Sequence, residues 1–402
     1  MGATSQLRDR YTIISSDCHA GGNHQQYREY LDPAYLERFD AWRGRYKNPF
    51  RDLQDDGRSR NWDDDRRISE MAADGVVAEV VFPNTVPPFF PTGVVIAQAP
   101  TTPEDYELRL AGIRAHNRWL ADFCAAHPTR RAGLGQILLN DVEDTLQDVR
   151  WISEHGLAGV LLPGVAPNTG IEPLYSPAYD PVWALCQELA LPVTHHGGGS
   201  GMPDFGSYPS STTMYMMEAG FFANRALWHL VMSGVFDRFP DLVFVMTEQG
   251  AGWIPGVLRQ MDDLNAAMRV GKFGELGPSA TVLPKDPSEY FAANCWVGTS
   301  FPPPGETEVF RQLGVEKFMW GSDYPHREGT YPYTRESLRR TFAGWDPADL
   351  RKLFSENIAA VYGFDLPALD DLAAEVGPTV DEVATPLDAV PADATSPAFY
   401  KS

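Results

Sequence analysis

The sequence predicts an α/β fold, a closed (β/α)8 TIM barrel, and two observations favour this class. Short apolar segments rich in β-branched residues alternate with amphipathic helical segments between residues 11 and 343. Helices that connect parallel strands cover the outside of the sheet, so eight such units close into a barrel. An open doubly wound sheet is the alternative, but no GxGxxG motif follows the first strand and the GGGSG segment at 197–201 lacks a Walker lysine.

The predicted elements follow one another in a regular order. The strands are apolar runs bounded by glycine, proline or polar residues, and they span 11–16, 76–82, 132–139, 158–162, 191–195, 243–247, 295–299 and 317–321. The helices repeat apolar residues at helical spacing, and they span 103–127, 142–155, 178–189, 214–236, 253–268, 306–312 and 335–343. Pro103 opens its helix and Gly156 closes the next one, as expected for helix boundaries.

Residues 1–366 are predicted to form one barrel domain with an insertion and a tail. The segment 21–65 carries many charges, scattered aromatic residues and weak periodicity, so we interpret it as an insertion that forms a lid or an oligomer contact. The segment 367–402 is rich in Ala, Asp and Pro, which predicts an extended tail packed on the body or on a neighbouring subunit.

The composition excludes several classes of protein. The 402 residues include 33 Lys and Arg against 54 Asp and Glu, a formal net charge of −21, which excludes a binder of nucleic-acid backbones. Hydrophobic residues at 43% and charged residues at 22% are typical of a globular protein rather than a disordered one. Four separated cysteines, no secretory leader and no apolar run of about 18 residues predict a cytoplasmic protein without a membrane partner.

Side chains that bind metals or transfer protons follow four of the predicted strands. Asp17 and His19 follow the first strand, His195 and His196 end the fifth, Glu248 follows the sixth and Asp323 the eighth. Residues two apart on a strand point to one face, and barrel enzymes place their catalytic groups at the carboxyl ends of the strands. Taken singly, each residue also has an ordinary interpretation, such as a helix cap, a core histidine, an ion pair or a turn. Their joint occurrence indicates a shared metal site.

Four segments resemble the amidohydrolase superfamily, in particular the subgroup related to aminocarboxymuconate-semialdehyde decarboxylase: SSDCHAG, LPVTHHGGGSG, LVFVMTEQGAGWIP and FMWGSDYPH, in that order. The resemblance covers residues 11–363 and implies a barrel whose metal is held by Asp17, His19, His196 and Asp323. His196 matches the family ligand better than His195 because it stands at the end of a P-x-x-x-H spacing from Pro192. The resemblance also makes Asp323 catalytic, as the acceptor of a proton from metal-bound water.

Two positions depart from the family pattern. The decarboxylases usually have histidine where this chain has Glu248, and the fourth strand ends in VLLPG without the lysine that some relatives carbamylate to bridge two metals. We interpret Glu248 as a second catalytic residue, acting either as a metal ligand or as a proton shuttle. Three carboxylates and two imidazoles suit one or two divalent ions, with zinc expected first and iron or manganese as alternatives.

Three further residues are candidates for substrate binding. His326 lies in the loop after the eighth strand and is expected to rim the pocket. Trp253 follows the sixth strand, where it either walls the pocket or begins the next helix. His195 faces away from His196 in a regular strand, and it reaches a substrate only if that strand kinks.

The predicted function is a metal-dependent hydrolase that cleaves an acyl bond, an amide, ester or thioester, of a small organic acid derivative. The alternative is a lyase that removes CO2 from an unsaturated or aromatic acid, as the named relatives do. Glu248 in place of the usual histidine favours hydrolysis. A catalytically silent scaffold is a third hypothesis, which the retained ligand types disfavour. Family habit also predicts a homodimer.

Overall fold

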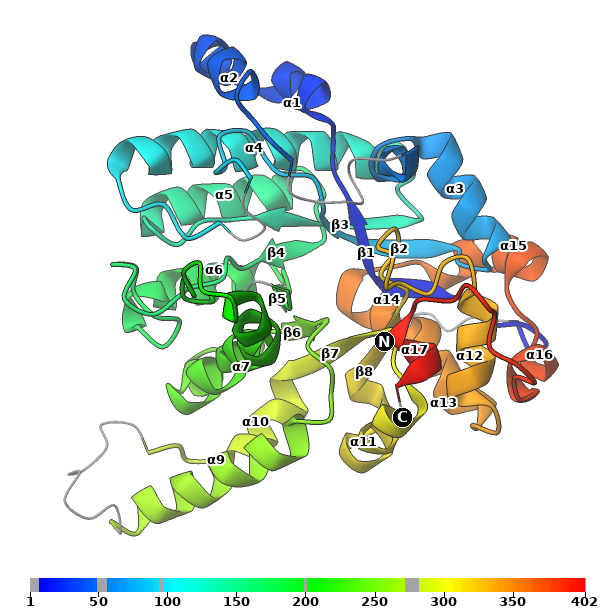
Figure 1. Ribbon diagram of the computed structural model, residues 1–402. Helices are drawn as coiled ribbons and strands as arrows, with labels where there is room; N and C mark the ends of the chain where they lie inside the picture. Colours follow the sequence, from blue (N-terminus) through cyan, green and yellow to red (C-terminus); the bar gives the residue numbers. More distant parts are fainter. Residues whose placement is uncertain (1–6, 49–55, 94–96, 199–200, 272–281, 402) are drawn as a thin grey trace.

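The computed structural model describes residues 7–48, 56–93, 97–198, 201–271 and 282–401. Eight parallel strands pair in sequence order, each with the next along the chain. They are β1 Ile14–Ala20, β2 Ala78–Pro83, β3 Arg131–Gln136, β4 Gly159–Leu161, β5 Val193–His196, β6 Phe244–Thr247, β7 Cys295–Ser300 and β8 Phe318–Gly321. Helices surround this sheet (Figure 1), so the predicted (β/α)8 barrel is confirmed.

The first strand differs from its prediction. It begins at Ile14 and runs through Asp17 to Ala20, whereas the predicted strand ends at Ser16. The polar residues at its end do not stop the strand because they are buried and have hydrogen-bond partners on β2 and β7.

The barrel closes just beyond the end of β8. The N–H of Asp323 donates to the carbonyl of Asp17 at 2.8 Å, and the N–H of His19 donates to the carbonyl of Tyr324 at 2.7 Å. Gly321 allows this approach, since a Cβ atom there would lie 2.7 Å from the Cβ of Asp17. The closing contacts therefore bring the ends of β1 and β8 together.

Seven helices lie at the predicted places. They are α4 Pro103–Ala125, α5 Val142–Glu154, α6 Asp180–Glu188, α7 Ser211–Met232, α9 Ile254–Arg269, α11 Thr307–Leu313 and α12 Thr334–Phe342. Helix α3 Asp64–Ala73, which precedes β2, was not predicted. The predicted helix 214–236 is divided, because Gly234 adopts a left-handed φ of +75° between α7 and α8 Val235–Arg238. The short helix α10 Pro287–Asn294 was not predicted.

The core has two main parts. One lies between the strands and the outer helices, where residues such as Val160, Trp183 and Leu230 pack. The other packs the early residues of several strands, including Ile14, against Ile358 of helix α14 Asn357–Tyr362. The second cluster fills the amino-terminal part of the barrel, which leaves the polar residues at the carboxyl ends of the strands.

Arg67, Arg131 and Glu79 form a network of buried ion pairs beside β1 and β2. The guanidinium of Arg67 donates to Glu79 with an Nε to Oε1 distance of 2.9 Å, and the Nε of Arg131 lies 3.2 Å from the same oxygen. Arg67 also donates to the backbone carbonyl of His19 at 2.8 Å. Each buried charge is paired, which offsets the cost of its desolvation, and the network fixes the end of β1.

The segment 21–65 contains helices rather than irregular chain alone. Helix α1 His24–Tyr30, helix α2 Leu36–Arg43 and the 3-10 helix η3 Asp56–Asn61 belong to it, and residues 49–55 lie outside the described residues. Figure 1 shows α1 and α2 beside α4. Helix α3 begins inside the predicted insertion, at Asp64, so the barrel resumes earlier than expected. The role as a lid or oligomer contact stays a prediction.

The predicted tail, 367–402, packs on the body but is not extended throughout. Before it, the chain forms α13 Pro347–Arg351, a π-helix Lys352–Glu356 and α14; the tail itself contains most of α15 Leu366–Val376, α16 Val380–Ala384 and α17 Pro397–Tyr400. Leu366, Leu369 and Ala373 are buried in α15 at helical spacing, a pattern that the Ala, Asp and Pro content obscures. The tail packs on its own chain, as the 3.0 Å ion pair between Arg335 and Glu382 shows.

No helix among the described residues is both long enough and apolar enough to cross a membrane.

Candidate metal centre

The four ligands expected from the resemblance lie together at the carboxyl ends of β1, β5 and β8. The Nε2 atom of His19 is 3.2 Å from Oδ1 of Asp17 and 3.1 Å from Oδ1 of Asp323. The Nε2 atom of His196 is 3.2 Å from the same oxygen of Asp17. Side chains more than three hundred positions apart in the sequence thus converge on one point.

The backbone is distorted where these residues stand. The pairing of β1 with β2 shifts its register between Ser15 and Cys18, and such an irregularity re-aims the side chains of a strand. Glu248 and Asp323, which directly or closely follow β6 and β8, have left-handed φ angles of +55° and +60°. Residues other than glycine keep such angles where the surroundings enforce them, most often at functional sites.

Hydrogen bonds with neighbouring residues orient two of the candidate metal ligands. Nδ1 of His19 lies 3.2 Å from the carbonyl oxygen of Pro83. Because that oxygen can only accept, a neutral His19 carries its proton on Nδ1 and turns the lone pair of Nε2 toward the cluster. The hydroxyl of Ser300 donates to Oδ2 of Asp17.

The cluster fits a divalent cation. The side chains of Asp17 and Asp323 are fully buried, and that of His19 nearly so. Nε2 of His19 and Oδ2 of Asp323 are buried without a hydrogen-bond partner among the described residues. Carboxylate and imidazole donors that point inward at one place, with atoms left unsatisfied, are the donor set of a transition-metal site.

The electrostatics agree with this interpretation. Burial alone would raise the pKa of Asp17, but His196 and His19 hold it well below its usual value. Burial likewise opposes the charged form of His19, yet Asp17 and Asp323 raise its pKa well above the usual value. The buried carboxylates therefore require positive charge beside them, which a bound cation supplies.

Glu248 lies at the edge of the cluster. Its Oε2 is 3.5 Å from Nδ1 of His196, the nitrogen that faces away from Asp17. It forms a candidate donor group with Asp323 and Glu328, separate from the group of Asp17, His19 and His196. Burial and the nearby Asp323 raise the pKa of Glu248 to about 8.

The structure places the three predicted substrate-binding residues differently. Nδ1 of His326 is 2.7 Å from Oδ1 of Asp323, so this side chain belongs to the cluster. The indole of Trp253 donates to the carbonyls of Gln249 and Gly250 at 3.1 and 3.0 Å, folding back on its own turn before α9.

His195 is buried and faces Gln249, whose Nε2 lies 3.1 Å from Nδ1. Burial lowers the pKa of His195 to about 3, which keeps the imidazole neutral. Strand β5 does not turn His195 into the cluster, so the alternation of a regular strand explains its position.

The sequence pattern did not single out two residues of the cluster, Ser300 and Asn84. Ser300 ends β7, and Asn84, which follows β2, lies 3.1 Å from Nε2 of His326 through its Oδ1. Both stand at strand ends, so the same rule that selected Asp17 and Asp323 could have found them. Serine and asparagine are too common after strands for their position alone to mark a site.

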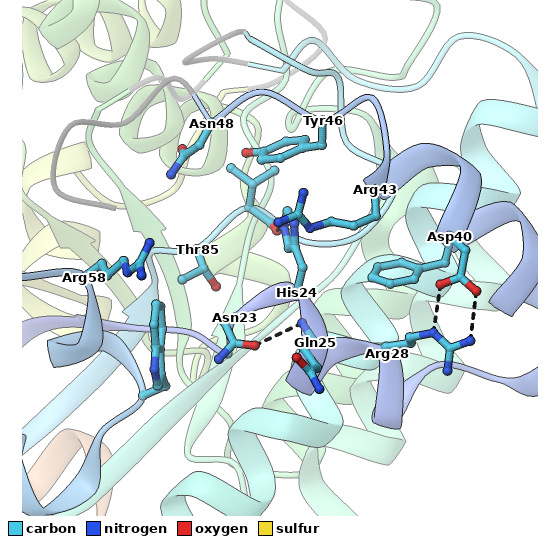
Figure 2. Close-up of a pocket in the computed structure, with 14 residues that line it drawn as sticks. Asn23, His24, Gln25, Arg28, Asp40, Arg43, Tyr46, Asn48, Arg58 and Thr85 are labelled. Atoms are coloured by element: carbon cyan, nitrogen blue, oxygen red, sulfur yellow. Dashed lines mark hydrogen bonds and ion pairs between the residues drawn. The ribbon is translucent and has the colours of Figure 1, made fainter. Parts of the chain in front are cut away.

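A cavity of about 830 Å³ lies beyond the ends of β1 and β2. Gly22, three residues after His19, and Thr85, next to Asn84, contribute to its wall. Figure 2 shows Arg43 and Arg58 among the side chains around it, together with His24 and the ring of Tyr46. Both guanidinium groups lie at the cavity wall, and no ion pair between described residues is found for either.

Comparison with known proteins identifies the family. A family model described as Amidohydrolase matches residues 17–364, so the chain belongs to the amidohydrolase family and is an enzyme of that class. The gamma-resorcylate decarboxylase of Rhodococcus jostii is 29% identical over 227 residues, which cover 53% of this chain and 65% of that protein. The 2-amino-3-carboxymuconate-6-semialdehyde decarboxylase of Dictyostelium discoideum is 27% identical over 279 residues, covering 66% and 68%.

Solved structures share the fold. The 5-carboxyvanillate decarboxylase of Sphingomonas paucimobilis superposes with a TM-score of 0.65 at 20% identity, covering 88% of this chain and 99% of the other. A dihydroxybenzoic acid decarboxylase from a Polaromonas species, solved with manganese and 2-nitroresorcinol, gives a TM-score of 0.61 at 19% identity, covering 88% and 97%.

These relatives overturn the prediction of an acyl-bond hydrolase. The two gamma-resorcylate decarboxylases and the semialdehyde decarboxylase that this chain resembles are named for loss of CO2, and the substitution of Glu248 for histidine, which favoured hydrolysis, does not outweigh them. The chain spans only 65% of the length of the curated gamma-resorcylate decarboxylases it matches.

Proposed function

We propose that this protein is a metal-dependent, non-oxidative decarboxylase of an aromatic or unsaturated carboxylic acid. One observation carries the proposal: His19 lies within 3.2 Å of both Asp17 and Asp323, and His196 lies 3.2 Å from Asp17, in a chain that is similar to curated decarboxylases. The cluster stands at the barrel end where enzymes of this fold carry out their chemistry.

The same four residues would hold one divalent ion. Manganese becomes the first candidate in place of zinc, because it is the metal in the solved decarboxylases from Polaromonas and Novosphingobium. When bound, the cation supplies a Lewis acid that orients the substrate's oxygen atoms and stabilises negative charge as the carbon–carbon bond breaks.

The chain itself supplies the proton. Loss of CO2 leaves an electron pair on the substrate carbon, and one proton must reach that carbon for the atoms to balance. Oδ2 of Asp323 is a buried oxygen of the cluster that has no hydrogen-bond partner among the described residues, so we assign the transfer to it. His326 fixes the other oxygen of this carboxylate at 2.7 Å.

Glu248 connects Asp323 with solvent. One carboxylate oxygen of each residue lies within 4.8 Å of the other, and the side chain of Glu248 is 21% exposed whereas that of Asp323 is buried. We assign Glu248 the role of returning a proton to Asp323 after each turnover. This assignment favours the proton-shuttle alternative over a second metal ion.

The cavity beside β1 and β2 suits an acidic, aromatic substrate. Its arginines attract a carboxylate toward a protein whose net charge of −21 otherwise repels anions. The rings of Tyr46 and Trp62 offer stacking surfaces for an aromatic substrate.

The test is an assay of the manganese-loaded enzyme with hydroxybenzoic acids that differ in the position of the hydroxyl groups. Release of CO2 with formation of the corresponding phenol supports the proposal, and Asp323→Asn should abolish it. Cleavage of esters, thioesters or amides without CO2 release from any acid would refute it.

A further inference from the structure

A second cavity, of about 170 Å³, lies at the carboxyl ends of β3 and β4. Its wall includes Gln136, the last residue of β3, and Leu161, the last residue of β4. Strand β4 stands between β3 and β5, so this space opens at the same end of the barrel as the candidate metal centre. We call it the β3–β4 cavity. Among the described residues, it shares no lining residue with the 830 Å³ cavity.

Apolar side chains from two clusters form most of the wall. Phe90, Ile113 and Leu138 belong to a small cluster beside α4, whereas Leu139 and Leu162 belong to the main core. Cavities of about 150 Å³ that are lined by Leu, Ile and Phe accept a benzene molecule. The β3–β4 cavity therefore has the size and the lining that suit one aromatic ring.

Most polar side chains of the wall already have partners. The guanidinium of Arg109 pairs with Asp105 through two N–H groups, at 2.8 and 2.7 Å, and also donates to the carbonyl of Gln98. Nδ2 of Asn140 donates to the carbonyl of Pro100 at 2.9 Å. Because the charge of Arg109 is already neutralised, a carboxylate in this cavity would lose its hydration without gaining a cation. The cavity therefore suits an uncharged ligand.

Gln136 is the exception among these polar side chains. Its Nε2 is buried and has no hydrogen-bond partner among the described residues. Asn117 holds the backbone of Gln136 in place, accepting its N–H at 2.9 Å and donating to its carbonyl at 2.8 Å. A buried amide without a partner costs free energy, which a ligand hydroxyl would recover. A hydroxyl both accepts and donates, so it can pair with either end of a side-chain amide.

We propose that the β3–β4 cavity is a binding site for a neutral phenol with a single ring. The hydroxyl pairs with the amide of Gln136, and the ring packs between the two apolar clusters, where Phe90 offers it an aromatic contact. The proposal rests on the cavity and not on the reaction. It assigns the uncharged ring to this site and leaves acids to the cavity that contains Arg43 and Arg58.

A ligand-observed nuclear magnetic resonance titration of the full chain with phenol tests the proposal. We expect a Kd of about 1 mM or lower, as befits so small a ligand. Gln136→Leu should raise the Kd for phenol by at least about fivefold and leave the Kd for toluene unchanged, because toluene has no hydroxyl. Gln147→Leu is the matched control, since Gln147 is exposed on α5, and it should bind phenol like the wild type.

A second variant fills the cavity. Ala99 lines it from a segment outside the helices and strands, so Ala99→Phe can occupy the space without displacing the barrel. This variant should weaken the binding of both phenol and toluene by at least about tenfold. The control is Ala392→Phe at an exposed residue of the tail, which should change neither Kd.

The outcomes are separate from those of the decarboxylase assay, because they are read as binding and not as release of CO2. Circular dichroism confirms the fold of each variant, and Ala99→Phe still decides if Gln136→Leu does not fold. A wild type that does not bind phenol, or equal Kd values for phenol in Gln136→Leu and the wild type, would overturn the proposal. Phenol binding that survives Ala99→Phe, or that depends on Arg58, would place the ligand elsewhere and overturn it as well.

Discussion

The backbone N–H of Asp323 donates a 2.8 Å hydrogen bond to the backbone carbonyl of Asp17. This bond joins the last strand of the barrel to the first, and the side chains of the same two residues meet at His19. The contacts that close the barrel are therefore the contacts that assemble the candidate metal centre. A substitution that changes only one of these side chains should alter the site and leave the closure intact.

Asp323→Asn tests this separation. The amide keeps the backbone hydrogen bond and the volume of the side chain, but it cannot deliver a proton at neutral pH. We expect turnover to fall by at least about 10³-fold while the far-ultraviolet circular dichroism stays that of the wild type. The assay is CO2 release with manganese in excess. A variant that keeps a tenth or more of the wild-type rate, as an order of magnitude, would remove Asp323 from the proton path.

Glu248→Gln separates a proton shuttle from a metal ligand. We expect the manganese content to stay at the wild-type value, because Glu248 lies beside Nδ1 of His196 and outside the group of Asp17 and His19. Turnover should fall by about 10- to 100-fold. Metal analysis and CO2 release on the same preparation give both values, and a lower metal content would show that Glu248 binds an ion.

Arg43 and Arg58 should contribute to substrate binding. Replacing Arg58 by Gln removes a positive charge from the cavity while keeping a polar side chain of similar length, so KM for an aromatic acid should rise by about tenfold or more. The control is Arg311→Gln, since Arg311 is exposed and pairs with Glu308 outside the cavity. If KM rises equally in both variants, the cavity does not bind the substrate.

Asp74 should make stability depend on pH. Burial raises the pKa of Asp74 to about 7, although its Oδ1 accepts the N–H of Thr334 at 3.1 Å. A carboxyl whose pKa is higher in the folded state than in the unfolded state stabilises the fold below about pH 4, and this stabilisation is lost as the pH rises through about 7.

The variant Asp74→Asn keeps a side-chain oxygen that can accept the N–H of Thr334, but its amide no longer gains or loses a proton with pH. Its free energy of unfolding, measured by urea denaturation, should equal that of the wild type near pH 4. Near pH 8 it should be higher than that of the wild type by about 1–3 kcal/mol. Asp346→Asn is the control, because Asp346 caps helix α13 in the same way but is exposed. If the difference in free energy of unfolding between Asp74→Asn and the wild type does not grow with pH, the account is contradicted.

The regular part of the fold could be predicted from sequence because its signal is local. The alternation of apolar strands with amphipathic helices located all eight strands, and the rule that catalytic groups lie at strand ends selected Asp17, His196 and Asp323 as candidates, which the structure brings together. The same alternation explains why His195 turns away from its neighbour.

The remainder depends on contacts that a single sequence does not encode visibly. The left-handed angles of Glu248 and Asp323 arise from the packing of strand ends, and ordinary propensities disfavour them. The helices after residue 366 are held by distant partners such as Arg335, which overcome a composition typical of extended chain. The prediction of hydrolysis rested on one residue, Glu248, and it was wrong. A carboxylate can serve hydrolysis and the return of a proton to a catalytic acid equally well.

Metal stoichiometry tests the central claim most directly, that side chains from β1, β5 and β8 hold one cation. Equilibrium dialysis against manganese, followed by elemental analysis, should find about one ion per chain in the wild type and at least about tenfold weaker binding in Asp17→Asn and His196→Asn. His155→Asn, an exposed histidine at the end of α5, should bind like the wild type. Equal binding in all four proteins, or none in the wild type, would contradict the account.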